Sequence, residues 1–352
     1  MNHNSFRPNW SARPADEKFT DLSTLETACR EKFESSQSRV YSSSEIEVHN
    51  FEDKDLHASL PCGDTRFSHW SFQQFANLAQ CPAEFLRKVC PELAAVNLNY
   101  GLRFMREPQE SNFYMWPNGN ADTPELRAVT GATYGRYPDF RCVQDVQEIA
   151  QGWSVPFDLS RRPNATTLYS ADRDVWMFLV DASRPITVPR QEKPAYRGFI
   201  VRNSEVGAGS WSMQGFLYNS LCENRTIFGF SALENLRIRH TSGAPDRIRF
   251  EGKAILRDFA MSSADEVEQR LLRADNIKIN KGNNASEWVR KQGFTKAQAE
   301  KVVVKATEEQ GQCETAWDAI QGMTALARSI THADSRVARE SVAGKVFERI
   351  TG

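Results

Sequence analysis

Hydrophobic and polar residues alternate in the middle of the chain, a pattern typical of β-strands. The alternation runs through 199–202 and returns at 210–216, after a turn with two glycines, which reach positive φ at little cost. Residues 165–182 contain a second pair of runs around a turn at 171–174. The later run, 175–180, is apolar on both faces, as expected of a buried central strand. These patterns predict an antiparallel sheet built from hairpins.

Apolar residues at helical spacing appear on both sides of this region. Between 68 and 105, serine caps and prolines divide the sequence into three short helices. They have the outline of a helix-turn-helix, but a packed helical lid on a sheet is the favoured interpretation. From Ser262 onward the period is helical again, and a stripe that includes Ile320 and Met323 indicates packing against the core or a partner.

We therefore expect an α+β fold with an antiparallel, hairpin-built central sheet, an N-terminal helical cluster and a C-terminal helical region. The polar N-terminus, residues 1–44, predicts a flexible arm with one short helix. Residues 45–261 are assigned to an α+β core domain that contains the antiparallel sheet, and residues 262–352 to the C-terminal helical region.

The composition is that of an ordinary globular protein, and it excludes a chain that is basic throughout. Among 352 residues, 44 Lys and Arg stand against 45 Asp and Glu, which gives a formal net charge of -1. No apolar run is long enough to cross a bilayer, and the N-terminus has no apolar segment of a secretory signal. The seven cysteines lack zinc-finger spacing, so we expect free thiols in a reducing cytoplasm.

A cluster of basic residues is the strongest chemical signal. Residues 236–239 and 247–250 alternate arginine with apolar residues on either side of the loop 241–246. If the two runs pair as a hairpin, four arginines share one face, where they repel one another unless an anion is bound. Guanidinium groups suit phosphate, whereas a solvated face neutralised by nearby acidic residues is the alternative. The basic residues and the histidine assigned to nucleic-acid binding are Arg202, Arg225, Arg237, Arg239, His240, Arg247, Arg249 and Lys253.

Aromatic residues close to another arginine add to this signal. Tyr134, Arg136 and Tyr137 follow a predicted strand, and Trp211 lies in the run after the glycine turn. Such residues stack on bases and hold a nucleic-acid backbone, although they are also common on ordinary strand surfaces. We assign all four to the nucleic-acid-binding site.

Motifs for catalysis are largely absent. The sequence has no P-loop, no dinucleotide-binding glycine motif and no G-x-S-x-G, so no cofactor and no catalytic residue is assigned. Asp172, Asp174 and Glu205 are weak candidates for a two-metal nuclease, which needs converging carboxylates on a sheet. Asp172 and Asp174 also suit an ordinary turn, and this interpretation is favoured.

Several segments resemble one known family. They include residues 72–103, 170–181, 198–211 and 316–328, and the most specific is GFIVRNSEVGAGS, which begins at Gly198. In these segments the chain is similar to the domain-of-unknown-function 932 family, whose members are described as phage/plasmid-like proteins. The resemblance implies an origin in a mobile element and no known activity. Mobile elements often carry single-strand annealing proteins, in which a hairpin sheet and helices form a basic groove.

The leading hypothesis is therefore a non-catalytic protein that holds single-stranded DNA on the arginine face and forms a homo-oligomer through its C-terminal helices. A second hypothesis is a phage or plasmid protein that binds and inhibits a host defence protein. A third is a metal-dependent nuclease. No membrane partner is expected.

Overall fold

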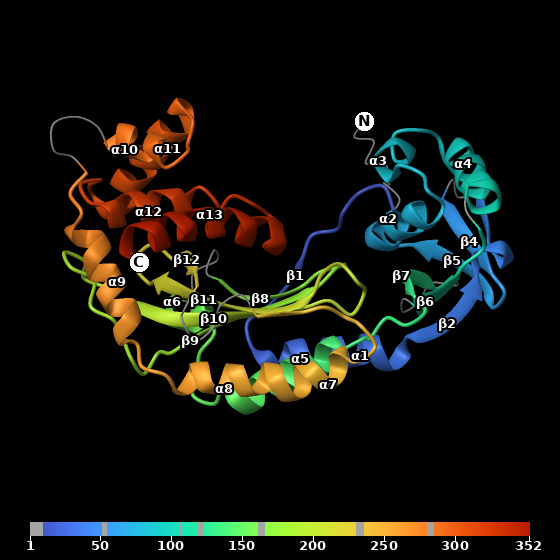
Figure 1. The fold of residues 1–352 in the computed structure, drawn as a ribbon, viewed down its shortest axis with the longest axis horizontal. Helices are drawn as coiled ribbons and strands as arrows, with labels where there is room; N and C mark the ends of the chain where they lie inside the picture. Colours follow the sequence, from blue (N-terminus) through green and yellow to red (C-terminus); the bar gives the residue numbers. More distant parts are fainter. Residues whose placement is uncertain are drawn as a thin grey trace, which may run out of the picture.

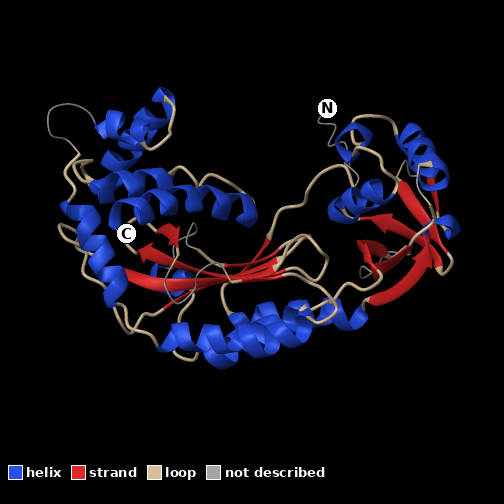
Figure 2. Ribbon diagram, in the orientation of Figure 1, coloured by secondary structure: helices blue, strands red, loops and turns tan. Residues whose placement is uncertain are grey.

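The chain folds into two lobes, each built on one β-sheet (Figure 1 and Figure 2). The computed structural model describes residues 10–50, 55–105, 107–117, 123–160, 166–229, 236–279 and 285–352. The larger lobe contains sheet A and most of the helices, and the smaller lobe contains sheet B and helices α2–α4. The predicted α+β class, with helices before and after an antiparallel sheet, is confirmed.

Sheet A has seven strands in the order β1-β8-β9-β10-β11-β12, and β13 pairs with β11 off this path. The pairs β8–β9 and β10–β11 are antiparallel, so the two hairpins predicted from alternation are confirmed. Every residue of β9 is buried, as its apolar pattern predicted. The strands are β1 (Glu17–Phe19), β8 (Leu168–Ser170), β9 (Val175–Val180), β10 (Ala195–Asn203), β11 (Trp211–Asn219), β12 (Asn224–Phe228) and β13 (Arg237–Ile238).

Sheet B has six strands in the order β2-β6-β7-β5-β4-β3, and its one parallel pair among the described residues is β5–β7. Helices α2 (His69–Leu78), α3 (Ala83–Leu86) and α4 (Pro91–Phe104) cover it, which confirms the predicted helical lid. The strands are β2 (Gln37–Ser42), β3 (Glu47–Asn50), β4 (Leu56–Leu60), β5 (Gly63–Phe67), β6 (Glu110–Trp116) and β7 (Glu125–Gly131).

Helices cover both faces of sheet A (Figure 1). Below the sheet in this view lie α1 (Leu22–Ser35), α5 (Asp139–Ile149), α7 (Ala244–Arg247) and α8 (Lys253–Met261). Above it lie α12 (Ala316–Ala325) and α13 (Ala333–Thr351). The remaining helices are α6 (Pro156–Ser160), α9 (Asp265–Asn276), α10 (Ala285–Lys291) and α11 (Lys296–Gln310). The sheet therefore lies between two apolar layers, one of which includes Phe178 and Val337 on the α13 face.

The N-terminal segment is part of the fold. Strand β1 pairs with β8 in sheet A, α1 packs under that sheet, and β2 pairs with β6 in sheet B. Leu25 and Cys29 of α1 are buried. The expectation of a flexible arm over residues 1–44 is therefore wrong for 10–44, apart from its one helix, while 1–9 lie outside the described residues. The arm prediction followed polar composition, but strand pairing with distant segments fixes this part of the chain.

The predicted arginine hairpin is not formed. Arg237 and Ile238 pair with β11, whereas 247–250 belong to α7 and to the π-helical segment Ile248–Gly252. Ile248, Leu256 and Phe259 are buried beneath sheet A. They recur at helical spacing, and the segment therefore forms a helix despite the short alternation of arginine and apolar residues.

Helix α13 lies in direct contact with strand β12 at Gly344. A Cβ atom added there would lie 1.5 Å from the carbonyl oxygen of Ile227, which belongs to the strand backbone. We expect Gly344→Ala to lower the free energy of unfolding by about 1–3 kcal/mol, although alanine favours helix by about 1 kcal/mol. Urea denaturation measures this, with Ser341→Ala on the same helix as the control. Unchanged or increased stability of Gly344→Ala would contradict the close contact.

Candidate nucleic-acid interface

Four residues form a row across sheet A on the face that α13 covers. Trp176 of β9 is opposite Arg202 of β10, Arg202 is opposite Ser212 of β11, and Ser212 is opposite Arg237 of β13. Directly opposed residues of neighbouring strands share one face. Strand pairing therefore brings together two arginines that lie far apart in the sequence.

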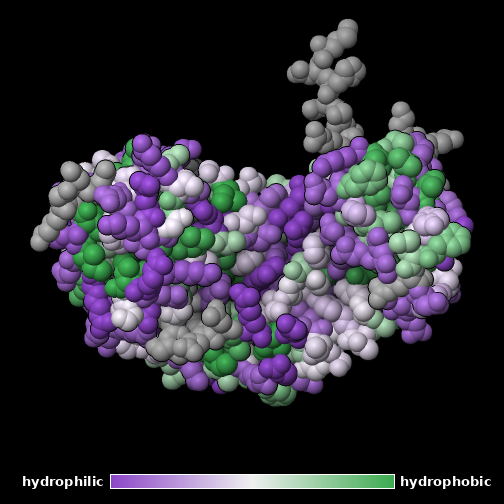
Figure 3. All heavy atoms as spheres, turned by 45° about the horizontal axis from the view of Figure 1, so that its top comes forward, coloured by the Kyte–Doolittle hydropathy of each residue, from purple (hydrophilic) through white to green (hydrophobic). Residues whose placement is uncertain are grey.

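This row lines an open groove beside α13. The groove has a volume of about 550 Å³, and α13 contributes one wall with Val337, Ser341 and Lys345. Ser210 and Gln214 extend the polar lining. Figure 3 shows hydrophilic side chains gathered over the hollow between the two lobes. The groove is thus polar and open to solvent, which suits an extended polar ligand.

Two cations of the groove have no acidic partner within the described part of the chain. Arg237 and Lys345 are exposed, and neither forms an ion pair with another described residue. Arg202 is held in place, because it pairs with the buried Asp174 at 2.7 Å and lies 5.0 Å over the Trp176 ring. The fixed Arg202 and the two unpaired cations favour an anionic ligand.

Carboxylates at the start of α13 are engaged by donors of the protein. Arg13 pairs with Asp334, which also lines the groove, at 2.9 Å. Burial raises the pKa of Asp334, but the hydrogen bond and charge of Arg13, together with the backbone N–H of Ser335 and the charge of Arg173, hold that pKa below its usual value. Asp16 accepts the backbone N–H of Ala333 at 2.7 Å and so caps the helix. These negative charges are therefore partly compensated within the protein.

A second cavity, of about 700 Å³, lies on the other side of the first turns of α13. Basic side chains line it, but most of them have acidic partners. The pairs are Arg328 with Glu309, Lys305 with Glu308 and Arg336 with Glu340. Lys18 of β1 is exposed at this cavity. The second cavity is therefore less electropositive than its number of basic residues suggests.

The loop after β10, residues 204–210, holds the two lobes together. Its Val206 carbonyl oxygen accepts hydrogen bonds from Trp70 at 3.0 Å and from Gln74 at 2.8 Å, both on α2 of the smaller lobe. Gly207 has φ +81°, and a Cβ there would lie 3.0 Å from Thr130 of β7. Glycine is needed at this position because the φ angle is positive and because Thr130 leaves little space for a side chain. We call residues 204–210 the clasp loop.

Glu205 is the buried centre of the clasp loop. Its carboxylate accepts hydrogen bonds from Arg127 at 2.6 Å, from Tyr114 at 3.4 Å and from the backbone N–H of Asp139 at 3.0 Å. The last contact caps the N-terminus of α5. Burial raises the pKa of Asp139 well above its usual range, and the Glu205 charge adds to this. Burial lowers the pKa of Arg127, but the charge and hydrogen bond of Glu205, together with Tyr114 and Asp139, raise that pKa overall.

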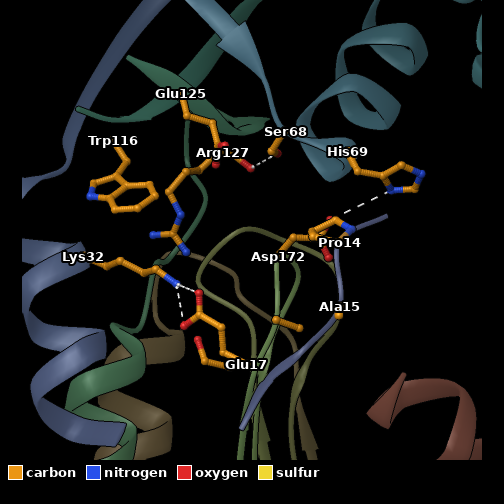
Figure 4. A pocket seen from close by; sticks show the side chains of 12 residues that line it. Pro14, Ala15, Glu17, Lys32, Ser68, His69, Trp116, Glu125, Arg127 and Asp172 are labelled. Atoms are coloured by element: carbon orange, nitrogen blue, oxygen red, sulfur yellow. Dashed lines mark hydrogen bonds and ion pairs between the residues drawn. The ribbon is translucent and has the colours of Figure 1, made fainter. Parts of the chain in front are cut away.

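A smaller cavity of about 170 Å³ lies between the lobes (Figure 4). Lys32 of α1 pairs there with Glu17 of β1 at 3.4 Å. His69 at the start of α2 lies 3.9 Å from Asp172. Burial and nearby arginines lower the pKa of His69 to about 4. The charges in this cavity are mixed, so a polyanion is less suited to it than to the groove beside α13.

The structure separates the arginines that the sequence analysis had grouped. Arg202 and Arg237 share the groove, but Arg225 is fully buried and pairs with Glu340 at 2.8 Å. Arg225 cannot contact a ligand, and its assignment to phosphate binding is wrong. The others lie outside the row: Arg239 and Arg249 are exposed, Arg247 pairs with Glu251, and Lys253 pairs with Asp145 and Glu148.

The assigned aromatic residues and His240 serve internal contacts. Trp211 is buried on the opposite face of sheet A, and Tyr137 is buried with its hydroxyl on Asp145. Tyr134 donates to the backbone of Ser204 at 2.7 Å and stacks on His240, which is itself buried. Arg136 donates to the backbone of Glu205 and lies 3.9 Å over the Tyr114 ring. In this arrangement, none of these five side chains is presented for base stacking.

The three candidate metal ligands are each held by an arginine. Asp174 pairs with Arg202, Glu205 with Arg127, and Asp172 with Arg13 at 3.6 Å. In the described ranges, no group of three or more His, Cys, Asp or Glu side chains is arranged to hold a metal ion. The carboxylates expected to converge in a two-metal nuclease therefore do not do so.

The sequence patterns did not identify Trp176 or Lys345 as residues of the groove. Trp176 lies in the strand that is apolar on both faces. Lys345 lies on α13, where Ser341 and Lys345 at i, i+4 form a polar strip beside the buried Gly344. That strip is a signal in the sequence, but it shows only that the two residues share one side of a helix.

Fold and groove together define an α+β protein with two sheets, a loop that contacts both lobes and a cation-bearing groove on the larger sheet. Residues 128–340 match a family described as a domain of unknown function (DUF932). The chain belongs to this family, because the match covers more than half of it and includes the clasp loop and the row from Trp176 to Arg237. No curated protein and no solved structure matches the chain. No helix in the described ranges has the length and apolar character for crossing a membrane.

Proposed function

We propose that this protein binds single-stranded nucleic acid, DNA in the first instance, in the groove between sheet A and α13. The observation that carries the proposal is the row of Trp176, Arg202, Ser212 and Arg237, with Lys345 on the wall above it. Fixed guanidinium groups bind phosphate oxygens and stack on bases. The groove is open, so a strand can enter it sideways.

The proposed binding site contains a different set of residues from the arginine face expected from the sequence. Arg202 and Arg237 remain, Lys345 is added, and the buried Arg225 is removed. The proposal assigns no catalytic step, because the carboxylates that a nuclease would use are paired with arginines. Annealing of complementary strands and an origin in a phage or plasmid are extensions of the same proposal.

Removing the two unpaired cations is the direct test. We expect Arg237→Ala together with Lys345→Ala to weaken binding of labelled single-stranded DNA. The slope of log K against log salt should fall by about 1.4, or about 0.7 for each phosphate that the protein no longer neutralises. Fluorescence anisotropy across a salt series measures both. Both side chains are exposed and unpaired among the described residues, so the fold should be preserved.

A matched control removes the same charge elsewhere. Arg249→Ala together with Arg257→Ala changes two exposed arginines of the π-helical segment and α8, below the sheet (Figure 1). This variant should keep the affinity and the slope of the parent. Equal losses in both variants, or no binding of DNA at low salt, would overturn the proposal. Preference for RNA would correct the ligand, and a stoichiometric host protein free of nucleic acid would favour the inhibitor hypothesis.

A further inference from the structure

Helix α4 in the smaller lobe exposes a stripe of large apolar side chains. Leu93, Val96, Tyr100 and Phe104 are 45%, 65%, 58% and 70% exposed. Their spacing of three or four residues places them along one face of the helix. The rings of Tyr100 and Phe104 lie 5.0 Å apart. Figure 3 shows hydrophobic side chains gathered on the lobe that carries α3 and α4.

The stripe is not the core face of the helix. Leu98 and Leu102 point into the core of the smaller lobe, where they are buried. Gly101 allows close approach there, since a Cβ would lie 2.0 Å from the carbonyl oxygen of Ala79. The helix is therefore held firmly by one face while the other apolar face meets solvent. A continuous exposed apolar surface of this kind marks an interaction site.

Charged residues at the two ends of α4 indicate what covers the stripe. Glu92 lies in the first turn and Arg103 in the last, and both are exposed. They are about three turns apart on the same flank of the stripe. Within its own chain Glu92 accepts a hydrogen bond from Asn50 at 2.8 Å, and Arg103 pairs with Glu47 at 3.0 Å. A carboxylate accepts several hydrogen bonds and a guanidinium has five N–H groups, so both can also bind a partner. When two copies of one helix pack antiparallel, the same flanks face each other and the first turn meets the last turn of the partner. Glu92 of each copy then faces Arg103 of the other, twice around the two-fold axis.

We propose that α4 is a homodimer contact, in which two copies of this chain pack antiparallel through the stripe. The surface is self-complementary in both respects: apolar residues meet apolar residues, and the acidic end meets the basic end. The proposal is independent of nucleic-acid binding, since α4 and the groove lie on different lobes (Figure 1). It also lies outside residues 128–340, the part of the chain that matches the family.

The expected dimer is weak. Fourteen residues of helix span about 21 Å, so this contact alone buries less than the roughly 800 Å² per partner of a standard interface. We expect a monomer–dimer equilibrium in the micromolar range, which sedimentation velocity over a concentration series measures. Phe104→Glu should raise the dissociation constant at least tenfold. Val304→Glu, which places the same charge at a 54% exposed position of α11, should leave it unchanged.

A charge exchange tests the antiparallel arrangement. Glu92→Arg places like charges opposite each other in the homodimer, and so does Arg103→Glu, so each variant alone should dimerise at least tenfold more weakly. A mixture of the two variants should form a heterodimer, because each Arg then faces a Glu of the other chain. The double variant Glu92→Arg with Arg103→Glu should dimerise as the parent does. Thermal melts confirm that each variant is folded.

Three results would overturn the proposal: a parent chain that stays monomeric at all concentrations, a dimer that persists in Phe104→Glu, or single charge variants that fail to associate when mixed. The first would leave the stripe to a different partner, and the second would place the dimer contact on another surface. None of these results bears on DNA binding, which is measured with separate variants in the larger lobe.

Discussion

Glu340→Leu is expected to lower the free energy of unfolding by about 3–5 kcal/mol. The Glu340 carboxylate is fully buried between two arginines, Arg225 of β12 at 2.8 Å and Arg336 of α13 at 3.0 Å. Arg225 is also fully buried and lies 4.1 Å over the Phe178 ring. Leucine has a similar size but no charge, so two buried guanidinium groups lose their shared partner. Urea denaturation followed by circular dichroism measures the change.

Two comparisons show whether buried charge causes this loss. Arg225→Met should destabilise less than Glu340→Leu, because Arg336 still pairs with the carboxylate. Glu251→Leu removes a carboxylate from an exposed pair with Arg247, where both side chains are about half exposed, and should lower the free energy of unfolding far less, because solvent screens the pair. If Glu340→Leu is no more damaging than Glu251→Leu, the triad does not stabilise the contact between α13 and sheet A.

Glu205→Leu is expected to have an effect of similar size, about 3–5 kcal/mol, for a related reason. The substitution leaves the buried Arg127 without its partner at 2.6 Å, and it removes the acceptor for the N–H of Asp139. Because Arg127 belongs to sheet B and Glu205 follows a strand of sheet A, the loss falls on the contact between the lobes. Guanidinium chloride unfolding, monitored by tryptophan fluorescence, measures it.

The double variant Arg127→Met with Glu205→Leu separates the pair from its surroundings. Replacing both charges with apolar groups removes the unpaired guanidinium, so part of the lost stability should return. If the double variant recovers none of the lost free energy of unfolding, the hydrogen bond from the Asp139 N–H, and not the ion pair, stabilises the clasp loop.

Part of the candidate site could be recognised in the sequence. Arg202 and Arg237 stood out as arginines in alternating strands, and both line the groove. Arg225 was assigned because it belongs to the same cluster of basic residues, yet it is buried. Local alternation shows that a side chain points to one face of a sheet, but not whether a helix covers that face. The residue that buries and neutralises Arg225 is Glu340, which lies 115 positions later in the chain.

The clasp loop is a second case in which the local sequence predicts an element but not its contacts. Its sequence indicated a turn, and the turn exists. That Glu205 accepts from Arg127 and that Val206 binds Trp70 follows from contacts with a different lobe. The local sequence therefore predicts the turn but not its role as an inter-lobe contact, because its partners lie 78 and 136 positions away in the chain.

By itself, the sequence determined the elements whose signals are local: the hairpins of sheet A, the helical lid on sheet B, the helical C-terminal region and the family. These depend on side-chain periods of two or 3.6 residues and on caps and turns. Only the tertiary structure decided which cations stay exposed. Arg237 and Lys345 lack acidic partners among the described residues, whereas Arg225 has Glu340, because burial and ion pairing depend on which distant segments the fold brings together.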